Sequence, residues 1–236
     1  MLITAALTAA LLTAAGCAAR PSSHAPSSPA QTSTAQTQEV AMTEATRNLI
    51  AAAESGDAEG VAAALDAGAE IDARGSGGMT ALVAATKANH VDAARTLIEA
   101  GADVNAKDDI QDSAYLYAGA RGHDEILRLT LEHGADLAST NRFGGTALIP
   151  AAERGLLSTV GILLEAGVDP DHVNNLGWTA LHEAIVLGDG SSRYVDVVRA
   201  LIDGGADIRI PDGDGVLPVD LAAGRGYDAV VAELRR

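Results

Sequence analysis

The sequence of 236 residues has one cysteine, Cys17, and few aromatic residues: one Phe, one Trp and four Tyr. A disulfide needs two cysteines, so none can form within this chain, and the lack of further thiols suits an oxidising compartment. Basic residues are also scarce, since 16 Lys and Arg stand against 32 Asp and Glu and give a net charge of −16. Such a negative field opposes binding to nucleic acid and favours a protein partner with a basic or neutral surface.

The first 16 residues are small and apolar, and no Lys or Arg precedes Arg20. This run is too short to span a bilayer but fits the apolar core of an export signal. Its end, Leu11–Cys17, resembles a bacterial lipoprotein signal, in which cleavage after Gly16 leaves Cys17 as a lipidated first residue. We therefore predict a signal peptide over residues 1–17 with lipidation at Cys17. Ordinary cleaved secretion and an uncleaved apolar tail are the alternatives.

Residues 18–42 are rich in Pro, Ser, Thr, Ala and Gln, and their only formal charges are Arg20 and Glu39. Such a segment buries too little apolar surface to offset the entropy of ordering, which predicts a disordered tether. Together with a lipid anchor, the tether would hold the folded part of the protein outside the cell membrane. Either the outer face of a Gram-positive membrane or a periplasm fits this prediction.

A regular repeat occupies residues 43–236. Copies of its first motif, Gly-x-Thr-Ala-Leu or a variant, are anchored at Thr80, Ser113, Thr146 and Thr179, each 33 residues from the next. A second motif, Gly-Ala-Asp or a near variant, begins at positions 68, 101, 134 and 167 and then, five residues late, at 205. A period of this kind determines the architecture, because each unit must bury its apolar face against its neighbours.

The best-preserved unit contains Gly177, Thr179, Leu181 and His182, and the second unit closes on Leu97–Asn105, which reads Leu-Ile-Glu-Ala-Gly-Ala-Asp-Val-Asn. These motifs resemble those of the ankyrin repeat. The resemblance implies an all-α fold, an ankyrin-repeat solenoid of stacked helix pairs with projecting hairpin tips. About six repeats, including caps at both ends, are expected at residues 43–74, 75–107, 108–140, 141–173, 174–211 and 212–236.

Local sequence predicts how the helices of these repeats begin and end. Thr80, Thr146 and Thr179 are expected to cap first helices through their hydroxyl groups, and Gly101 to end a second helix in the left-handed conformation. Pro150 should delete one backbone hydrogen bond near the start of its helix. The five extra residues of repeat five, within residues 189–194, predict a flexible bulge between its two helices.

No arrangement of residues in the sequence calls for catalysis. His182 is followed by Glu183, but no second histidine comes four residues after the first, so the zinc-protease motif is absent. The resemblance assigns His182, His90 and His123 to hydrogen bonding within the fold, and Asp212–Gly215 is an incomplete calcium loop. We therefore expect no cofactor, no metal and no catalytic residue. The alternative is an enzyme or small-ligand-binding protein that uses groove residues Asp112, Glu153, Arg154 and Glu183.

The resemblance places the contact surface on the hairpin tips and on the exposed edge of the first helices. The only Phe and the only Trp, Phe143 and Trp178, fall on adjacent tips, and aromatic and Arg side chains are common interface anchors. The predicted centre of the binding site consists of Phe143, Trp178, Arg142 and Arg154. Further candidates are Met79, Lys87, Asp112, Arg121, Glu153, Asn175 and Tyr194. The expected function is that of a non-catalytic, monomeric scaffold that binds a protein partner outside the cell membrane.

Overall fold

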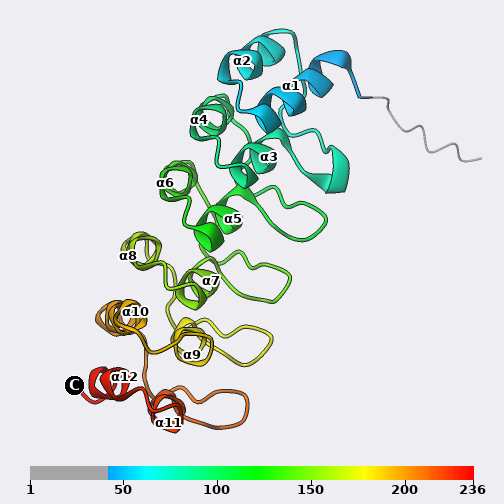
Figure 1. The fold of residues 1–236 in the computed structure, drawn as a ribbon. Helices are drawn as coiled ribbons and strands as arrows, with labels where there is room; N and C mark the ends of the chain where they lie inside the picture. Colours follow the sequence, from blue (N-terminus) through cyan, green and yellow to red (C-terminus); the bar gives the residue numbers. More distant parts are fainter. Residues whose placement is uncertain (1–41) are drawn as a thin grey trace, which may run out of the picture. The chain divides into compact units, whose positions relative to one another are not determined.

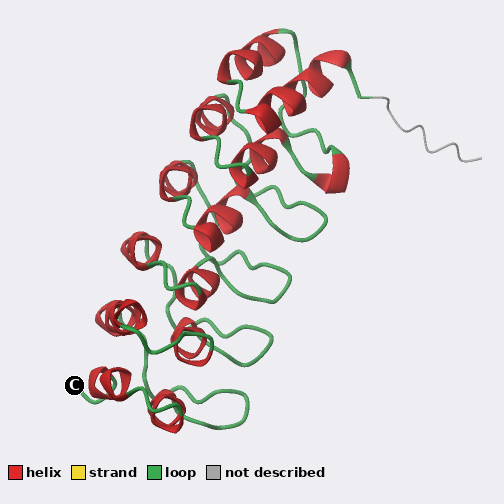
Figure 2. Ribbon diagram, viewed as in Figure 1, coloured by secondary structure: helices red, strands yellow, loops and turns green. Residues whose placement is uncertain are grey.

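Residues 42–236 fold into α-helices joined by loops, with no strand in this part of the chain (Figure 1, Figure 2). The structure is a computed structural model, and the predicted signal segment, Cys17 and residues 18–41 of the predicted tether lie outside the residues that it describes. None of the described helices is long and apolar enough to pass through a bilayer. The prediction of an all-α solenoid of helix pairs is confirmed.

The helices form two layers, in which the first helices of successive repeats pack on one another and the second helices do the same (Figure 1). The first helices are α1 (Glu44–Ser55), α3 (Ala81–Lys87), α5 (Ala114–Arg121), α7 (Leu148–Glu153), α9 (Ala180–Val186) and α11 (Pro218–Gly224). The second helices are α2 (Ala58–Asp66), α4 (Val91–Glu99), α6 (Asp124–Glu132), α8 (Leu157–Glu165), α10 (Ser192–Asp203) and α12 (Asp228–Glu233). A short 3-10 helix, η1 (Ser76–Gly78), lies in the loop before α3. The loops before α3, α5, α7, α9 and α11 project from the side of the first helices, away from the second helices (Figure 1).

Apolar residues at helical spacing explain this packing. Helix α4 buries Ala93, Ala94, Leu97 and Ile98 on one face, and a buried side chain of the size of Leu97 or Ile98 stabilises the fold by about 2 kcal/mol. The helix ends two residues before Gly101, which has a φ of +94°. Glycine adopts this left-handed backbone without the steric cost of a Cβ atom, so the chain can turn toward the next repeat.

Thr80 and Thr146, two of the three threonines expected to cap first helices, differ from each other. Thr80 caps α3 as expected, because its Oγ1 accepts a hydrogen bond of 3.2 Å from the backbone N–H of Val83. The expectation is wrong for Thr146, since α7 begins only at Leu148 and the Thr146 hydroxyl is buried with no hydrogen-bond partner in residues 42–236. Pro150 lies in the first turn of α7 and has no N–H to donate to the Thr146 carbonyl oxygen, which accepts instead from the N–H of Ile149 at 3.2 Å. The late start leaves α7 the shortest of the first helices.

Hydrogen bonds to the carbonyl end of the preceding first helix also hold adjacent repeats together. The His90 ring bonds to the carbonyl oxygen of Glu54 at 3.1 Å, and the His123 ring to that of Thr86 at 3.0 Å. Because a carbonyl oxygen can only accept, a ring N–H donates in both cases. These contacts agree with the structural role expected for the two histidines.

The extra residues of repeat five lie only in part between its two helices, where residues 187–191 form a connection of five residues against three between α7 and α8. Helix α10 has 12 residues, whereas α4, α6 and α8 have nine each, so part of the added length extends the helix. Tyr194, predicted to contact a partner, is only 6% exposed, and its hydroxyl donates a hydrogen bond of 2.9 Å to the carbonyl oxygen of Glu153. Tyr227 makes the equivalent bond to Gly188 at 3.0 Å in the next repeat. The placement of Tyr194 at a contact surface is therefore wrong, because its side chain joins two repeats in the interior.

Candidate protein-binding site

One Asp or Asn side chain holds each projecting tip from repeat three onward. In repeat four, Oδ1 of Asn141 accepts hydrogen bonds from the backbone N–H groups of Phe143, at 2.9 Å, and of Gly145, at 3.1 Å. The same two bonds, to the residues two and four positions later, are made by Asp108, Asn174 and Asp212. A short side-chain acceptor that bonds to its own turn is the reason Asn and Asp favour such positions. Because the first residue of the tip fixes the loop backbone, the side chain of the third residue is not needed for this and can stay exposed.

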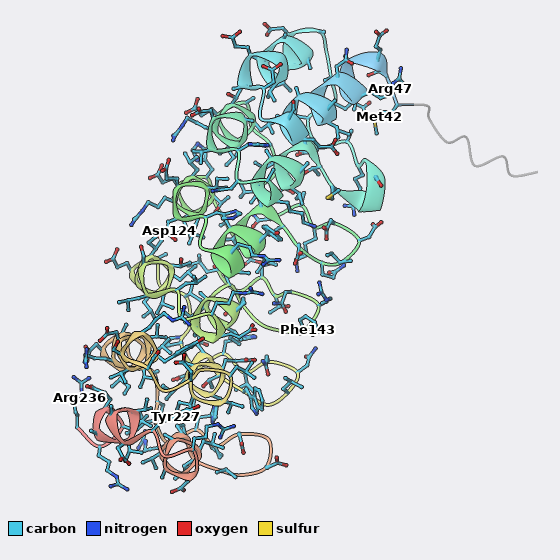
Figure 3. All side chains as sticks on the ribbon, viewed as in Figure 1. Met42, Arg47, Asp124, Phe143, Tyr227 and Arg236 are labelled. Atoms are coloured by element: carbon cyan, nitrogen blue, oxygen red, sulfur yellow. The ribbon has the colours of Figure 1, made fainter. Side chains whose placement is uncertain are left out.

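Three successive tips expose an apolar side chain at this third position. Ile110 is 48% exposed, Phe143 56% and Leu176 62%. Figure 3 shows Phe143 at the outer end of its loop, on the side away from the second helices. The first and last tips carry Gly77 and Asp214 instead, so the row of apolar tip residues is confined to repeats three to five. Large exposed apolar side chains grouped in this way are a common mark of an interaction surface.

The tips of repeats four and five are joined to each other. The backbone N–H of Asn175 donates a hydrogen bond of 3.0 Å to the carbonyl oxygen of Phe143. The Arg142 guanidinium lies over the Phe143 ring, 4.6 Å from its centroid, in cation–π geometry. These contacts restrain Phe143, which lowers the entropic cost of using it as an anchor.

A pocket of about 220 Å³ opens between repeats four and five, next to these tips. Two loops and the first helices α7 and α9 supply its walls, and Glu153 and Glu183 are its only charged lining residues. The lining consists of Asn141, Phe143, Gly145, Ile149, Pro150, Glu153, Asn174, Leu176, Glu183 and Leu187. This volume is smaller than that of a drug-sized ligand site and suits a single side chain.

Glu183 is the most unusual group in the pocket, because it is a carboxyl group that is only 5% exposed. Its Oε1 accepts a hydrogen bond of 2.9 Å from Nδ2 of Asn174, the residue whose Oδ1 holds the tip of repeat five. Burial, and after it repulsion from Glu153, raise the pKa of Glu183 to about 7, while the Asn174 hydrogen bond opposes the rise. The charge of the pocket therefore changes around neutral pH.

The structure brings some of the predicted contact residues to this pocket. Phe143 and Glu153 line it, and Arg142 and Asn175 lie on the exposed tips beside it. Trp178 is half-buried and does not line the pocket. Arg154 is exposed like Arg142 and Asn175. It follows directly after the end of α7 and does not line the pocket.

The other predicted contact residues lie in repeats two and three. Met79 and Lys87 line a second, shallow pocket. The Lys87 ammonium group lies 2.5 Å from Oδ2 of Asp108 and 3.9 Å from Oδ2 of Asp112. Burial disfavours the charge on Asp108, but hydrogen bonds from Lys87 and the tip backbone outweigh it and lower the pKa of this carboxyl group. The Arg121 guanidinium packs over the Tyr117 ring at 5.4 Å. Lys87, Asp112 and Arg121 thus already have partners within the chain.

Sequence reasoning missed three apolar residues of the pocket between repeats four and five: Ile149, Pro150 and Leu187. Ile149 and Pro150 lie in α7 and Leu187 directly follows α9, so the repeat pattern predicts only that they belong to a helix or its end. In the structure, Leu187 is 52% exposed and is therefore a surface residue. Leu176 lies at the third position of its tip. Its alignment with Phe143 and Ile110, 33 residues apart in each step, is the signal that identifies the row.

The four groove residues of the enzyme alternative are not gathered at one place. Glu153 and Glu183 share the pocket, whereas Asp112 is paired with Lys87 in repeats two and three and Arg154 lies outside the lining. Within residues 42–236, His, Cys, Asp and Glu side chains form no group of three that could hold a metal ion.

Comparison with known proteins identifies the family. A family model of ankyrin repeats in three copies matches residues 33–108 and 115–212. An ankyrin repeat domain from Acinetobacter baumannii AYE is 56% identical, covers 79% of this chain and 95% of its own, and has a TM-score of 0.78. A second ankyrin repeat protein, EF0377, is 41% identical over 81% of this chain and 98% of its own, also with a TM-score of 0.78. Comparison with curated proteins gives no match.

The chain belongs to the ankyrin repeat family. Proteins of this family are protein–protein interaction scaffolds in general. Their repeats share one fold, and the function of each protein depends on particular residues on that fold.

Proposed function

We propose that this protein is a non-catalytic, monomeric scaffold that binds a protein partner through the tips of repeats three to five and the pocket beside them. The observation that carries the proposal is the row of exposed apolar tip residues, Ile110, Phe143 and Leu176. Apolar side chains that are exposed in the free protein gain free energy when a partner covers them. Leu187, 52% exposed on the pocket wall, adds to the same surface.

The chemistry of the surface agrees with an interface. Its apolar centre is bordered by polar and charged groups, including Arg142 and Asn175, which can bond to a partner at the rim. The tips are held by their own Asp and Asn residues, so a partner meets a preformed surface. The net charge of −16 favours a partner that is basic or neutral.

Replacing Phe143 and Leu176 together by alanine should reduce partner binding at least about tenfold, because both anchors are lost. The full chain, immobilised on beads, is used to capture proteins from a membrane extract of its host, and the bound protein is quantified by mass spectrometry. Leu157→Ala is the matched control, since Leu157 is a 43% exposed leucine on α8, in the other helix layer. A protein captured equally by the double variant and by the wild type would contradict the assignment of the site.

We also propose that the protein is exported and tethered to the outside of the cell membrane through a lipid on Cys17. The support is the apolar segment that ends in Leu11–Cys17 and the composition of residues 18–42. In this arrangement the apolar tips would meet proteins of the membrane surface or the periplasm.

Labelling growing cells with a fatty-acid probe should mark the wild-type protein and leave a Cys17→Ala variant unmarked, because the chain has no other cysteine. The wild type should fractionate with membranes. Equal labelling of both proteins, or no labelling of either, would contradict lipidation at Cys17. The outcome is independent of the partner-binding surface, since Cys17 lies far from it in sequence.

A further inference from the structure

We infer that the pocket between repeats four and five takes the guanidinium group of an arginine from the partner, with an adjacent apolar residue of the partner against Phe143 and Leu176. This inference rests on the proposed binding function and specifies the chemistry of the partner. It goes beyond the exposed row of tips, because it concerns the buried carboxyl group behind them.

The first step concerns hydrogen bonding at Glu183. Although the side chain is 5% exposed, residues 42–236 donate only one hydrogen bond to its carboxyl group, from Asn174 Nδ2 to Oε1. Oε2 has no donor in this part of the chain, and the residue lines the pocket. Oε2 is not one of the fully buried unpaired side-chain atoms of residues 42–236, so it is open to the pocket, where an N–H donor of a ligand can reach it.

The second step concerns charge. The only charged lining residues, Glu153 and Glu183, both carry carboxyl groups, and they come from the adjacent helices α7 and α9. Their mutual repulsion disfavours the ionised form of Glu183. A cation placed between them would reverse this effect, since it would favour both carboxylates at once.

The third step concerns the shape of the cation. Arginine presents five N–H donors in a planar fork, so one guanidinium group can bond to two carboxylates, whereas the ammonium group of lysine is a compact and strongly hydrated charge. Arg142, on the tip of repeat four, is stacked on the Phe143 ring at 4.6 Å and does not line the pocket. A pocket of about 220 Å³ has room for one such side chain.

The fourth step concerns the neighbours of the arginine. Phe143 and Leu176 stand on the two tips beside the pocket and are 56% and 62% exposed. A segment that places an arginine in the pocket brings its adjacent residue against these tips. Leucine or another aliphatic residue would bury the exposed apolar surface there.

The single tryptophan of the chain gives a local readout. The backbone N–H of Trp178 donates to Asn174 Oδ1, and Asn174 also donates to Glu183, so occupation of the pocket should change Trp178 fluorescence. The full chain is titrated at about pH 8 with the peptide acetyl-Ala-Leu-Arg-Leu-Ala-amide. A second peptide has citrulline in place of arginine, which keeps the shape and removes the charge.

We expect the arginine peptide to bind at least about tenfold more tightly than the citrulline peptide, a difference of roughly 1.4 kcal/mol. Glu183→Gln should abolish this preference, and Glu153→Gln should weaken it. Glu165→Gln, at an exposed glutamate that ends α8 outside the pocket, should leave it unchanged. Circular dichroism confirms that each variant keeps its helices.

Equal binding of the two peptides, a preference that survives Glu183→Gln, or no binding of either peptide at millimolar concentration would overturn the inference. These results leave the proposed function standing if the Phe143 and Leu176 double variant still loses its captured partner. If the double variant captures as well as the wild type, the proposed function fails first, whatever the peptides do.

Discussion

Replacing Leu181 by alanine should lower the free energy of unfolding by about 2 to 5 kcal/mol. Leu181 is 1% exposed in α9, and α9 packs on α7, α10 and α11. The substitution removes three buried carbon atoms and leaves a cavity that rigid neighbouring helices fill only in part. Because each repeat of a solenoid is stabilised by its neighbours, a cavity in repeat five weakens the interfaces on both sides.

Urea unfolding of the full chain, followed by circular dichroism, measures this effect. The control is Leu187→Ala, since Leu187 follows the same helix but is 52% exposed and should cost less than about 1 kcal/mol. Leu187→Ala should instead weaken partner binding, because Leu187 lines the pocket. Equal losses of stability in the two variants would show that α9 does not bury the face that contains Leu181.

The sequence predicts the fold well because the repeat determines it physically. Each glycine that begins the Gly-Ala-Asp motif, such as Gly101 at a φ of +94°, adopts the left-handed conformation that ends a second helix. The Asp or Asn at the start of most tips, such as Asn141, closes its loop with two side-chain hydrogen bonds. Such residues act locally, through backbone bonds to neighbours in the chain, so their spacing is enough to infer the structure.

Departures from the repeat were harder to predict because their outcome depends on tertiary packing. The extra residues of repeat five suggest a loop by length alone, yet the hydroxyl of Tyr194 reaches the carbonyl oxygen of Glu153, 41 positions earlier, and the residues around it are helical. That bond recurs in the next repeat through Tyr227. The start of α7 also departs from the repeat. Pro150 lies in its first turn, and the hydroxyl group of Thr146 has no hydrogen-bond partner within residues 42–236.

The candidate site was predicted only in part for the same reason. Phe143 could be found from the scarcity of aromatic residues and its place on a tip, and the structure leaves it 56% exposed. Trp178, chosen by the same criteria, is half-buried, because its position closes the tip with a backbone bond to Asn174. The burial of Glu183 and its neighbour Glu153 arises from two helices that are separate in sequence. No spacing rule within one repeat could reveal that environment.

Replacing Glu183 by glutamine should stabilise the protein in a pH-dependent manner, by about 2 kcal/mol more at about pH 8.5 than at about pH 5. Burial, followed by repulsion from Glu153, raises the pKa of Glu183 from an ordinary value of 4.5 to about 7. Between these values the folded protein binds more protons at this group than the unfolded chain does. The stability of the wild type therefore falls as pH rises through this range, and the full penalty is present above about pH 7.

The glutamine variant escapes this penalty because its side chain does not titrate, and its oxygen can still accept the hydrogen bond that Asn174 donates to Oε1. Urea unfolding of both proteins at the two pH values measures the difference, with Glu165→Gln as the control at an exposed position. A stability difference that is the same at both pH values would mean that Glu183 titrates normally in the folded protein. Glu183 thus weakens the free fold at neutral pH, and it lies beside an exposed apolar surface. A cationic partner that binds there would recover the free energy that folding gives up, as expected of a preformed site.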